Sequence, residues 1–113
     1  MPILLLLTTI ALSSAVCGSA ADHKAISAAI KRHGHVVGTV FPTTIVGNYA
    51  DAAVTSAHSD VSVLLVKKNG SWKVLAAGGG AYDSGTMERY GIPAATATKL
   101  SREVQQAVCA SPP

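Results

Sequence analysis

The sequence has few aromatic residues. Its 113 residues include one tryptophan, one phenylalanine and three tyrosines, which together make up 4% of the chain. We therefore expect a small aliphatic core in which Trp72 is the one large side chain. No linker long enough to separate two domains interrupts the chain, so a single domain is expected.

The first twenty residues contain no charged side chain. The apolar run from Ile3 to Leu12 is followed by small residues, which is typical of the hydrophobic and cleavage regions of a secretory signal peptide. The run is too short to span a bilayer comfortably. We predict a signal peptide over 1–21, a single domain over 22–110 and a frayed tail over 111–113, in a protein that is secreted or periplasmic.

The two cysteines, Cys17 and Cys109, leave three alternatives open. Cleavage at the end of the predicted signal peptide, after Ala20 or Ala21, removes Cys17 and leaves Cys109 unpaired. Cleavage after Ala15 keeps Cys17, which can then pair with Cys109 in an oxidising compartment. In the third alternative Cys17 carries a lipid that anchors the protein to a membrane, because SAVC is similar to a bacterial lipobox except for the valine.

The net charge of +3 is spread over the chain. A nucleic-acid-binding protein typically concentrates its basic residues on one face, so no nucleic-acid partner is expected. Lys67, Lys68 and Lys73 gather around one predicted turn. We interpret them as protection of a hairpin tip, and contact with an anionic surface is the alternative.

The strongest local signal is the segment 61–78, VSVLLVKKNGSWKVLAAG. Two apolar runs flank Asn69-Gly70, the dipeptide that most readily forms a two-residue type I′ turn. The resulting register predicts the pairs Lys68–Ser71, Lys67–Trp72, Leu65–Val74 and Val63–Ala76. Alternation along the strands then places on one face Val61, Val63, Leu65, Trp72, Val74 and Ala76. The opposite face is mixed, and its apolar members are Leu64, Val66, Leu75 and Ala77.

Helices are predicted on both sides of this hairpin in the sequence. The first covers 23–33, with Asp22 as N-cap and Gly34 as the residue that ends it. The last begins at Pro93. It carries an apolar stripe at Ala97, Leu100, Val104, Ala107 and Val108.

Three antiparallel strands are expected at roughly 46–55, 61–68 and 71–78, preceded by a short edge strand that Pro42 ends. The predicted fold class is α+β: an N-terminal helix, a three-stranded antiparallel meander, and a C-terminal helix packed on one face of the sheet. Both helices are expected on the face that carries Trp72.

The side chains that could support catalysis do not form a convincing site in the sequence. His33, His35 and His58 are the candidate ligands of a metal-dependent enzyme, but no two histidines have the i, i+4 spacing of a helical zinc site. Asp51 and Glu88 are the two acids that could lie in a cleft between sheet and helix. We predict no metal, no cofactor and no catalysis.

Binding is the remaining function. An apolar strip exposed on the outer face of the hairpin, formed by Leu64, Val66 and Leu75, is the candidate interaction surface. The expected partner is an unidentified protein or a component of the cell envelope. Contact with a membrane is expected only through the signal peptide or a lipid on Cys17.

Three segments, NYADAAVTS, VSVLLVKKNGSWKVLAAGGG and GIPAATATKL, resemble a group of small exported bacterial proteins of unknown function. That group combines a (W/Y)AxAxV strand, a VLLxKxNGxWxV hairpin and a G-(I/V)-P step that opens a terminal helix. The resemblance covers Tyr49 to Cys109 and implies a fold and export, but no activity. Members of the group usually have a cysteine between the third strand and the G-(I/V)-P step. Residues 81–90 contain none here, which favours pairing of Cys109 with Cys17.

Overall fold

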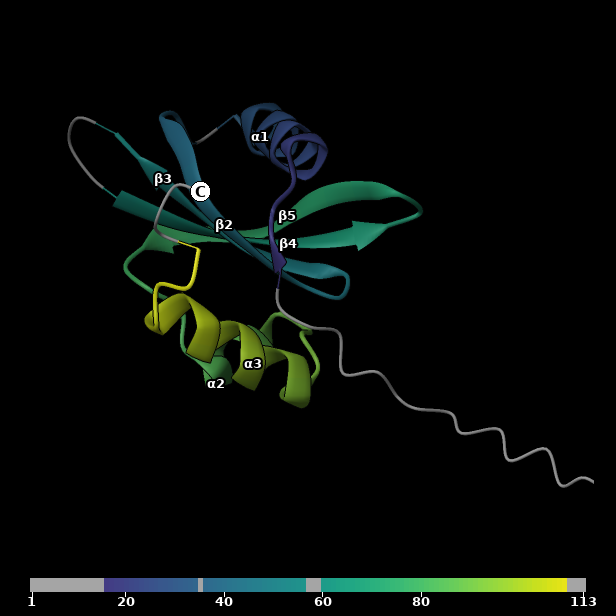
Figure 1. The fold of residues 1–113 in the computed structure, drawn as a ribbon, viewed down its shortest axis with the longest axis vertical. Coiled ribbons are helices and arrows are strands. Elements are labelled where there is room, and N and C mark those ends of the chain that lie inside the picture. The colour runs from purple at the N-terminus through teal and green to yellow at the C-terminus, as the bar shows by residue number, and fades with distance from the viewer. Residues whose placement is uncertain (1–15, 35, 57–59, 110–113) are drawn as a thin grey trace, which may run out of the picture.

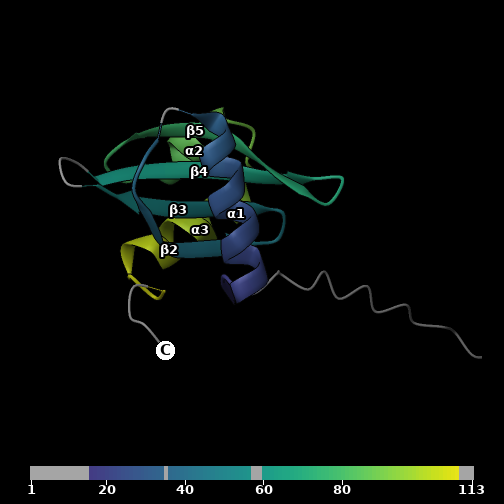
Figure 2. The ribbon, with the colours of Figure 1, turned by 90° about the horizontal axis from the view of Figure 1, so that it is seen from above.

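The computed structural model describes residues 16–34, 36–56 and 60–109. Within these residues an antiparallel sheet of five strands in the order β1-β2-β3-β4-β5 lies between two helical layers. Helix α1 covers one face, and α2 and α3 cover the other (Figure 1; Figure 2 shows α1 crossing the sheet). The elements are β1 (Val16–Cys17), α1 (Ala20–His33), β2 (Thr39–Val46), β3 (Tyr49–Thr55), β4 (Asp60–Lys68), β5 (Ser71–Gly79), α2 (Ser84–Arg89) and α3 (Ala94–Gln105).

The α+β class is confirmed, but the predicted architecture is wrong. The sequence predicts a three-stranded meander that follows an N-terminal helix, whereas the described sheet has five strands and its first helix follows β1. The helices also pack on both faces and not on the Trp72 face alone. The reason is that β4 is apolar on both sides, with Val63 and Leu65 under α1 and Leu64 under α2 and α3. A sheet with two apolar faces needs a cover on each.

The hairpin of β4 and β5 turns at Asn69-Gly70, as predicted. Both residues have positive φ, 51° and 78°, as a type I′ turn requires. Three predicted pairs are confirmed: Lys68–Ser71, Lys67–Trp72 and Leu65–Val74. The fourth is wrong, because a β-bulge in β5 makes Leu64 the partner of Ala76. Ala76 therefore packs with Leu64 on the α2–α3 side and not beside Trp72.

Both ends of α1 are capped. Its N-cap is Ser19 and not the predicted Asp22. The Ser19 hydroxyl accepts a hydrogen bond from the backbone N–H of Asp22 (3.1 Å), and the Asp22 carboxylate accepts one from the backbone N–H of Ser19 (3.2 Å). Gly34 ends the helix at φ 82°, as predicted. Ile26 and Ile30 of α1 are buried against the sheet.

Replacing Ser19 with alanine is expected to lower the free energy of unfolding by about 1 kcal/mol, because the backbone N–H of Asp22 loses its acceptor. Urea unfolding followed by far-ultraviolet circular dichroism measures the loss. Ser19→Thr keeps the hydroxyl and serves as the control. Equal stability of the Ser19→Ala variant and the parent protein would contradict the capping role.

Strands β2 and β3 differ from the predicted long strand over 46–55 and its short edge strand. Strand β2 continues through Pro42, because the pairing with β3 shifts between Val40 and Thr43 and the ladder does not need an N–H at the proline. A two-residue turn at 47–48 then separates β2 from β3. Gly-Asn is a turn sequence, and it divides the predicted strand.

Helix α3 begins at Ala94, one residue after the predicted start, with Pro93 as its N-cap, and ends at Gln105. Its residues Ala97, Leu100 and Val104 join Leu64 in a second core between the sheet and the helices. Met87 of α2, a short helix that is not predicted from the sequence, is fully buried in the same core. The last two predicted stripe positions lie beyond the helix, and Val108 is 52% exposed.

Candidate functional site

The hairpin residues predicted as an interaction surface are buried or half-buried. Leu64 is 0% exposed and Leu75 is half-buried, because α2 and α3 pack on this face of the sheet. Val66 is also buried. The three side chains therefore do not form an exposed surface. Leu64 and Leu75 belong to the second core.

Cys17 and Cys109 form a disulfide. The bond joins β1 to the turn that follows α3, so it connects the two ends of the described fold. The Cys17 sulfur cannot at the same time carry a lipid thioether, so the disulfide and the lipid anchor exclude each other. A disulfide is compatible with an exported, oxidising location. Across the described residues, no helix combines the length and the apolar character that a membrane span requires.

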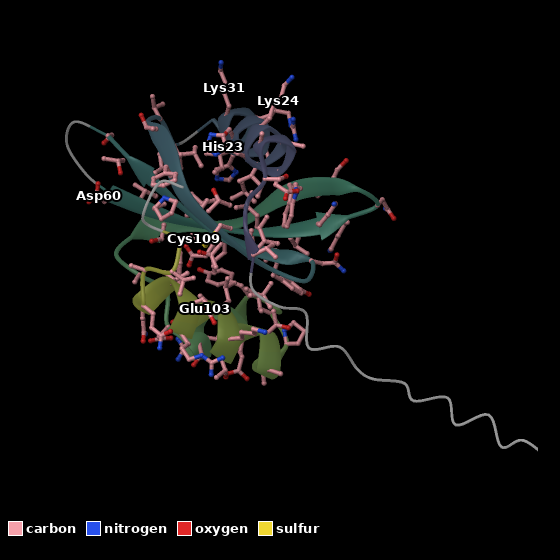
Figure 3. The ribbon with its side chains drawn as sticks, viewed as in Figure 1. His23, Lys24, Lys31, Asp60, Glu103 and Cys109 are labelled. Atoms are coloured by element: carbon pink, nitrogen blue, oxygen red, sulfur yellow. A yellow bond between two sulfur atoms is a disulfide. The ribbon has the colours of Figure 1, made fainter. Side chains whose placement is uncertain are left out.

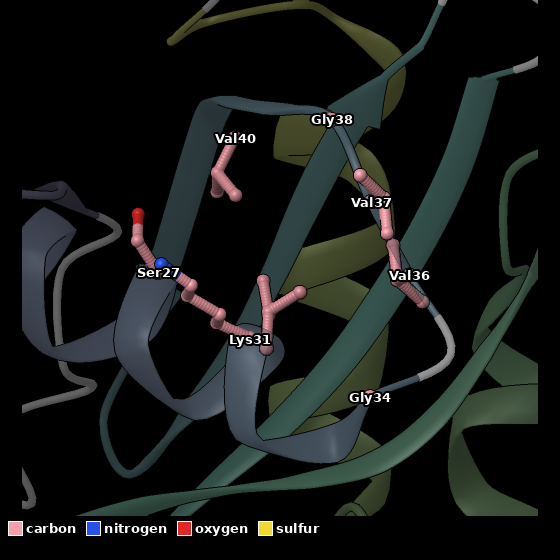
Figure 4. Close-up of a pocket in the computed structure, with 8 residues that line it drawn as sticks. Ser27, Lys31, Gly34, Val36, Val37, Gly38 and Val40 are labelled. Atoms are coloured by element: carbon pink, nitrogen blue, oxygen red, sulfur yellow. The ribbon is translucent and has the colours of Figure 1, made fainter.

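A groove of about 380 Å³ lies between α1 and the segment that leads from α1 to β2 (Figure 4). The lining residues are Ser27, Ile30, Lys31, Gly34, Val36, Val37, Gly38 and Val40. Its walls are mainly aliphatic, and Val37 is 84% exposed. The volume and the apolar character of the groove are in the range of sites that bind small molecules.

Two glycines position the segment that forms the outer wall of the groove. Gly34 takes the left-handed conformation that ends α1 and turns the chain back toward the sheet. Gly38, at φ 155°, lies so close to β3 that a Cβ would come 2.5 Å from the carbonyl oxygen of Thr55. Only glycine permits this approach. The apolar pair Val36-Val37 lies between these two glycines and lines the groove beside α1.

The groove contains two polar groups on its α1 wall, Ser27 and Lys31 (Figure 4). The Ser27 hydroxyl is buried and has no hydrogen-bond partner among the described residues. A buried hydroxyl without a partner carries a desolvation cost that a bound acceptor would relieve. Lys31 lies one helical turn later on the same face and adds a positive charge. Together these groups favour an apolar ligand with one anionic or acceptor group.

The predicted metal ligands do not converge in the part of the chain that can be described. His33 is the last residue of α1, and His35 and His58 lie outside the described residues. Among the described residues, no three His, Cys, Asp or Glu side chains are placed to hold a metal ion.

The two acids expected between sheet and helix are separated. Asp51 of β3 is buried, whereas Glu88 of α2 is exposed. Asp51 instead lines a cavity of about 50 Å³ together with Glu103 of α3. Burial raises the pKa of Asp51 to about 7. Asp51 is therefore a buried acid, and we expect it to affect how the stability of the protein depends on pH.

The groove is not predicted from the sequence. One signal for it is present, because Val36-Val37 is an apolar pair between Gly34 and Gly38 that belongs to neither the helix nor the strand. No sequence signal identifies Ser27, because whether its hydroxyl finds a hydrogen-bond partner depends on how α1 packs on the sheet.

Comparison of the chain with models of protein families finds no match, and neither curated proteins nor solved structures give one.

Proposed function

We propose that this protein is an exported, non-catalytic binding domain that holds a small amphiphilic carboxylate in the groove between α1 and β2. The observation that carries the proposal is an aliphatic groove with a buried hydroxyl at Ser27 that no other described residue hydrogen-bonds. Binding sites of this size use apolar walls for affinity and a few polar groups for orientation.

The groove residues divide between the two parts of such a ligand. An alkyl chain would contact Ile30, Val36 and Val37, which have no polar side-chain atoms. The carboxylate would accept a hydrogen bond from the Ser27 hydroxyl and another from the Lys31 ammonium. Of the described residues that line the groove, Lys31 alone carries a titratable side chain, which supports binding and not acid–base chemistry.

Export is supported by the uncharged apolar N-terminus together with the disulfide. Because Cys17 pairs with Cys109 and Ser19 caps α1, cleavage after Ala15 is the expected processing step. Intact-mass measurement of the exported protein should give a chain that starts at Val16 with no free thiol. A mature chain that starts at Ala21 or Asp22 would refute this processing.

The binding site is tested with decanoate as the probe, in a nuclear magnetic resonance titration of the oxidised protein. We expect saturable shifts at Ser27, Lys31 and the segment 36–40. Lys31→Gln should weaken binding roughly tenfold, because a charge-assisted hydrogen bond is lost. Lys24→Gln is the matched control, since Lys24 lies on the same helix outside the groove (Figure 3).

A second pair of variants tests the apolar wall. Val37→Ser removes an exposed apolar side chain from the groove. Val108→Ser removes an exposed apolar side chain that does not line the groove. Only Val37→Ser should weaken decanoate binding. Equal effects of the two variants, or no saturable shift up to the solubility limit of decanoate, would overturn the proposed site.

A further inference from the structure

A second groove, of about 270 Å³, runs between the last turn of α1 and the edge strand β5. Its lining residues are Ala29, Arg32, His33, Ser71, Trp72, Lys73 and Val74. Four of them are consecutive in β5. Because side chains alternate between the faces of a strand, a groove on one face would touch only every second residue. This groove therefore follows the edge of β5 as well as its α1 face.

The edge of β5 offers unpaired backbone groups. Strand β5 is the last strand of the sheet, so no described strand pairs with its outer side. Lys67 pairs with Trp72 across the hairpin, but the backbone N–H of Lys67 donates to the carbonyl oxygen of Asn48 at 2.7 Å. Trp72 is therefore in a pair without hydrogen bonds, and its N–H faces outward, as does that of Val74 two residues later.

The same edge is lined by cations. Arg32 and Lys73 line the groove, and the Lys67 ammonium lies 5.8 Å from the centre of the Trp72 ring. Lys68 is exposed at the start of the turn. Trp72 itself is buried under α1, so it is a support for Lys67 and not an exposed platform for a ligand.

The acids of the chain lie elsewhere, and all six are among the described residues: Asp22, Asp51, Asp60, Asp83, Glu88 and Glu103. Asp22 is engaged in the cap at the opposite end of α1. Asp60 lies at the end of the sheet away from the hairpin turn, and Glu103 lies on α3 (Figure 3). No acidic side chain in the described structure pairs with Arg32, Lys68 or Lys73, so this edge carries unneutralised positive charge.

From this edge and its charge we propose that β5 docks an extended acidic segment of a partner protein, which adds to the sheet as a sixth strand. The backbone N–H groups of Trp72 and Val74 would donate to the added strand. Arg32 and Lys73 would pair with its acidic side chains. The β-bulge beyond Val74 bends β5 and limits the docked stretch to the part of the strand next to the turn.

This mode of binding distinguishes a peptide from other anions. A lipid surface or a phosphate polymer can meet the charges of Arg32 and Lys73, but it has no backbone to pair with Trp72 and Val74. Protection of these two amides from hydrogen exchange is thus specific to strand addition. The groove between α1 and β2 lies on the other side of α1 and shares no lining residue with this one.

The test uses the full oxidised protein and a synthetic peptide of alternating glutamate and valine. We expect binding that weakens as salt is added, together with slower exchange of the Trp72 and Val74 amides. A peptide with lysine in place of glutamate, and one with a central proline, should both fail to bind. If the acidic peptide does not bind, or binds without amide protection, the proposal is overturned.

Charge-reversal variants locate the surface. Lys73→Glu and Arg32→Glu should each raise the Kd for the acidic peptide roughly tenfold. Arg102→Glu is the matched control, because Arg102 is exposed on α3, which lies on the face of the sheet opposite to α1. Equal effects at all three positions would indicate attraction by net charge alone. Binding to phosphatidylglycerol vesicles with no amide protection would assign the surface to lipid. Either result overturns the proposal.

Discussion

Removal of the disulfide by serine substitution at both Cys17 and Cys109 is expected to lower the free energy of unfolding by about 4 kcal/mol. The bond spans 92 residues of sequence, so it restricts nearly the whole unfolded chain. The chain-entropy account of disulfides assigns the largest stabilisation to such long loops. Small domains are stable by only about 5–15 kcal/mol in total, so much of the stability depends on this bond.

Urea unfolding of the oxidised protein, the dithiothreitol-reduced protein and the double serine variant measures this effect. The last two should unfold at a similar, lower urea concentration. Dithiothreitol should not change the double variant, which is the control for effects of the reductant. If reduction leaves the midpoint of the parent protein unchanged, the disulfide does not contribute as expected.

Loss of the disulfide should also promote local unfolding of the two segments that it joins. Strand β1 pairs with β2 over two residues only, and the turn that holds Cys109 lies beyond the end of α3. Without the disulfide these two segments have few other contacts, so we expect their amides to exchange first, while the hairpin of β4 and β5 stays protected.

The features that the sequence predicts correctly depend on residues close together in the chain. The Asn69-Gly70 turn, the end of α1 at Gly34 and the start of α3 within one residue of Pro93 each follow from the backbone preferences of one or two residues. Such preferences act before any tertiary contact forms. They predict where elements begin and end, but not which face of a sheet a helix covers.

The incorrect predictions concern packing. Leu64 has the same alternation whether it faces solvent or a helix, and only the position of α3 decides between them. The bulge in β5 reverses the side of Ala76, and one added residue is enough to do so. A two-sided core also explains why the aliphatic strip on the outer hairpin face is not exposed.

The candidate site was predictable only in part. Val36-Val37 between two glycines indicates an apolar segment outside the regular elements, and the cationic hairpin is visible as Lys67, Lys68 and Lys73. The approach of Arg32 to this hairpin depends on how α1 crosses the sheet, which no local pattern encodes. The unpaired edge of β5 likewise appears only when the order of the strands is known.

The stability of the protein is expected to fall as the pH rises from about 4 to about 7. Asp51 is 4% exposed, and its Oδ2 atom has no hydrogen-bond partner among the described residues. Burial raises the pKa of this carboxyl group from its ordinary value of 3.8 to about 7. In this pH range the folded protein keeps a proton on Asp51 that the unfolded chain has already released.

The fall in stability with increasing pH follows from proton linkage. When the unfolded state binds fewer protons than the folded state, the free energy of unfolding decreases with increasing pH. The contribution of Asp51 is complete below pH 3.8 and is lost as the pH rises through about 7. A shift of this size corresponds to about 4 kcal/mol. Tyr82 also has a raised pKa, chiefly through burial, but from an ordinary value of 10.0, so it does not titrate in this range.

Asp51→Asn should remove most of this pH dependence, because the amide cannot ionise. At pH 8 the variant is expected to be more stable than the parent by roughly 2–4 kcal/mol, since the parent then has an unpaired buried charge beside Glu103. At pH 4 the two should be nearly equal, with a small loss in the variant if the added N–H₂ group has no acceptor.

Urea unfolding of both proteins at several pH values from 4 to 8 measures the effect. Asp60→Asn is the matched control, because Asp60 is exposed at the end of the sheet and its replacement should leave the slope unchanged. A pH dependence of the same size in Asp51→Asn as in the parent would show that another group is responsible. If the slope disappears only in Asp51→Asn, the buried carboxyl of β3 makes this fold more stable in acid than at neutral pH.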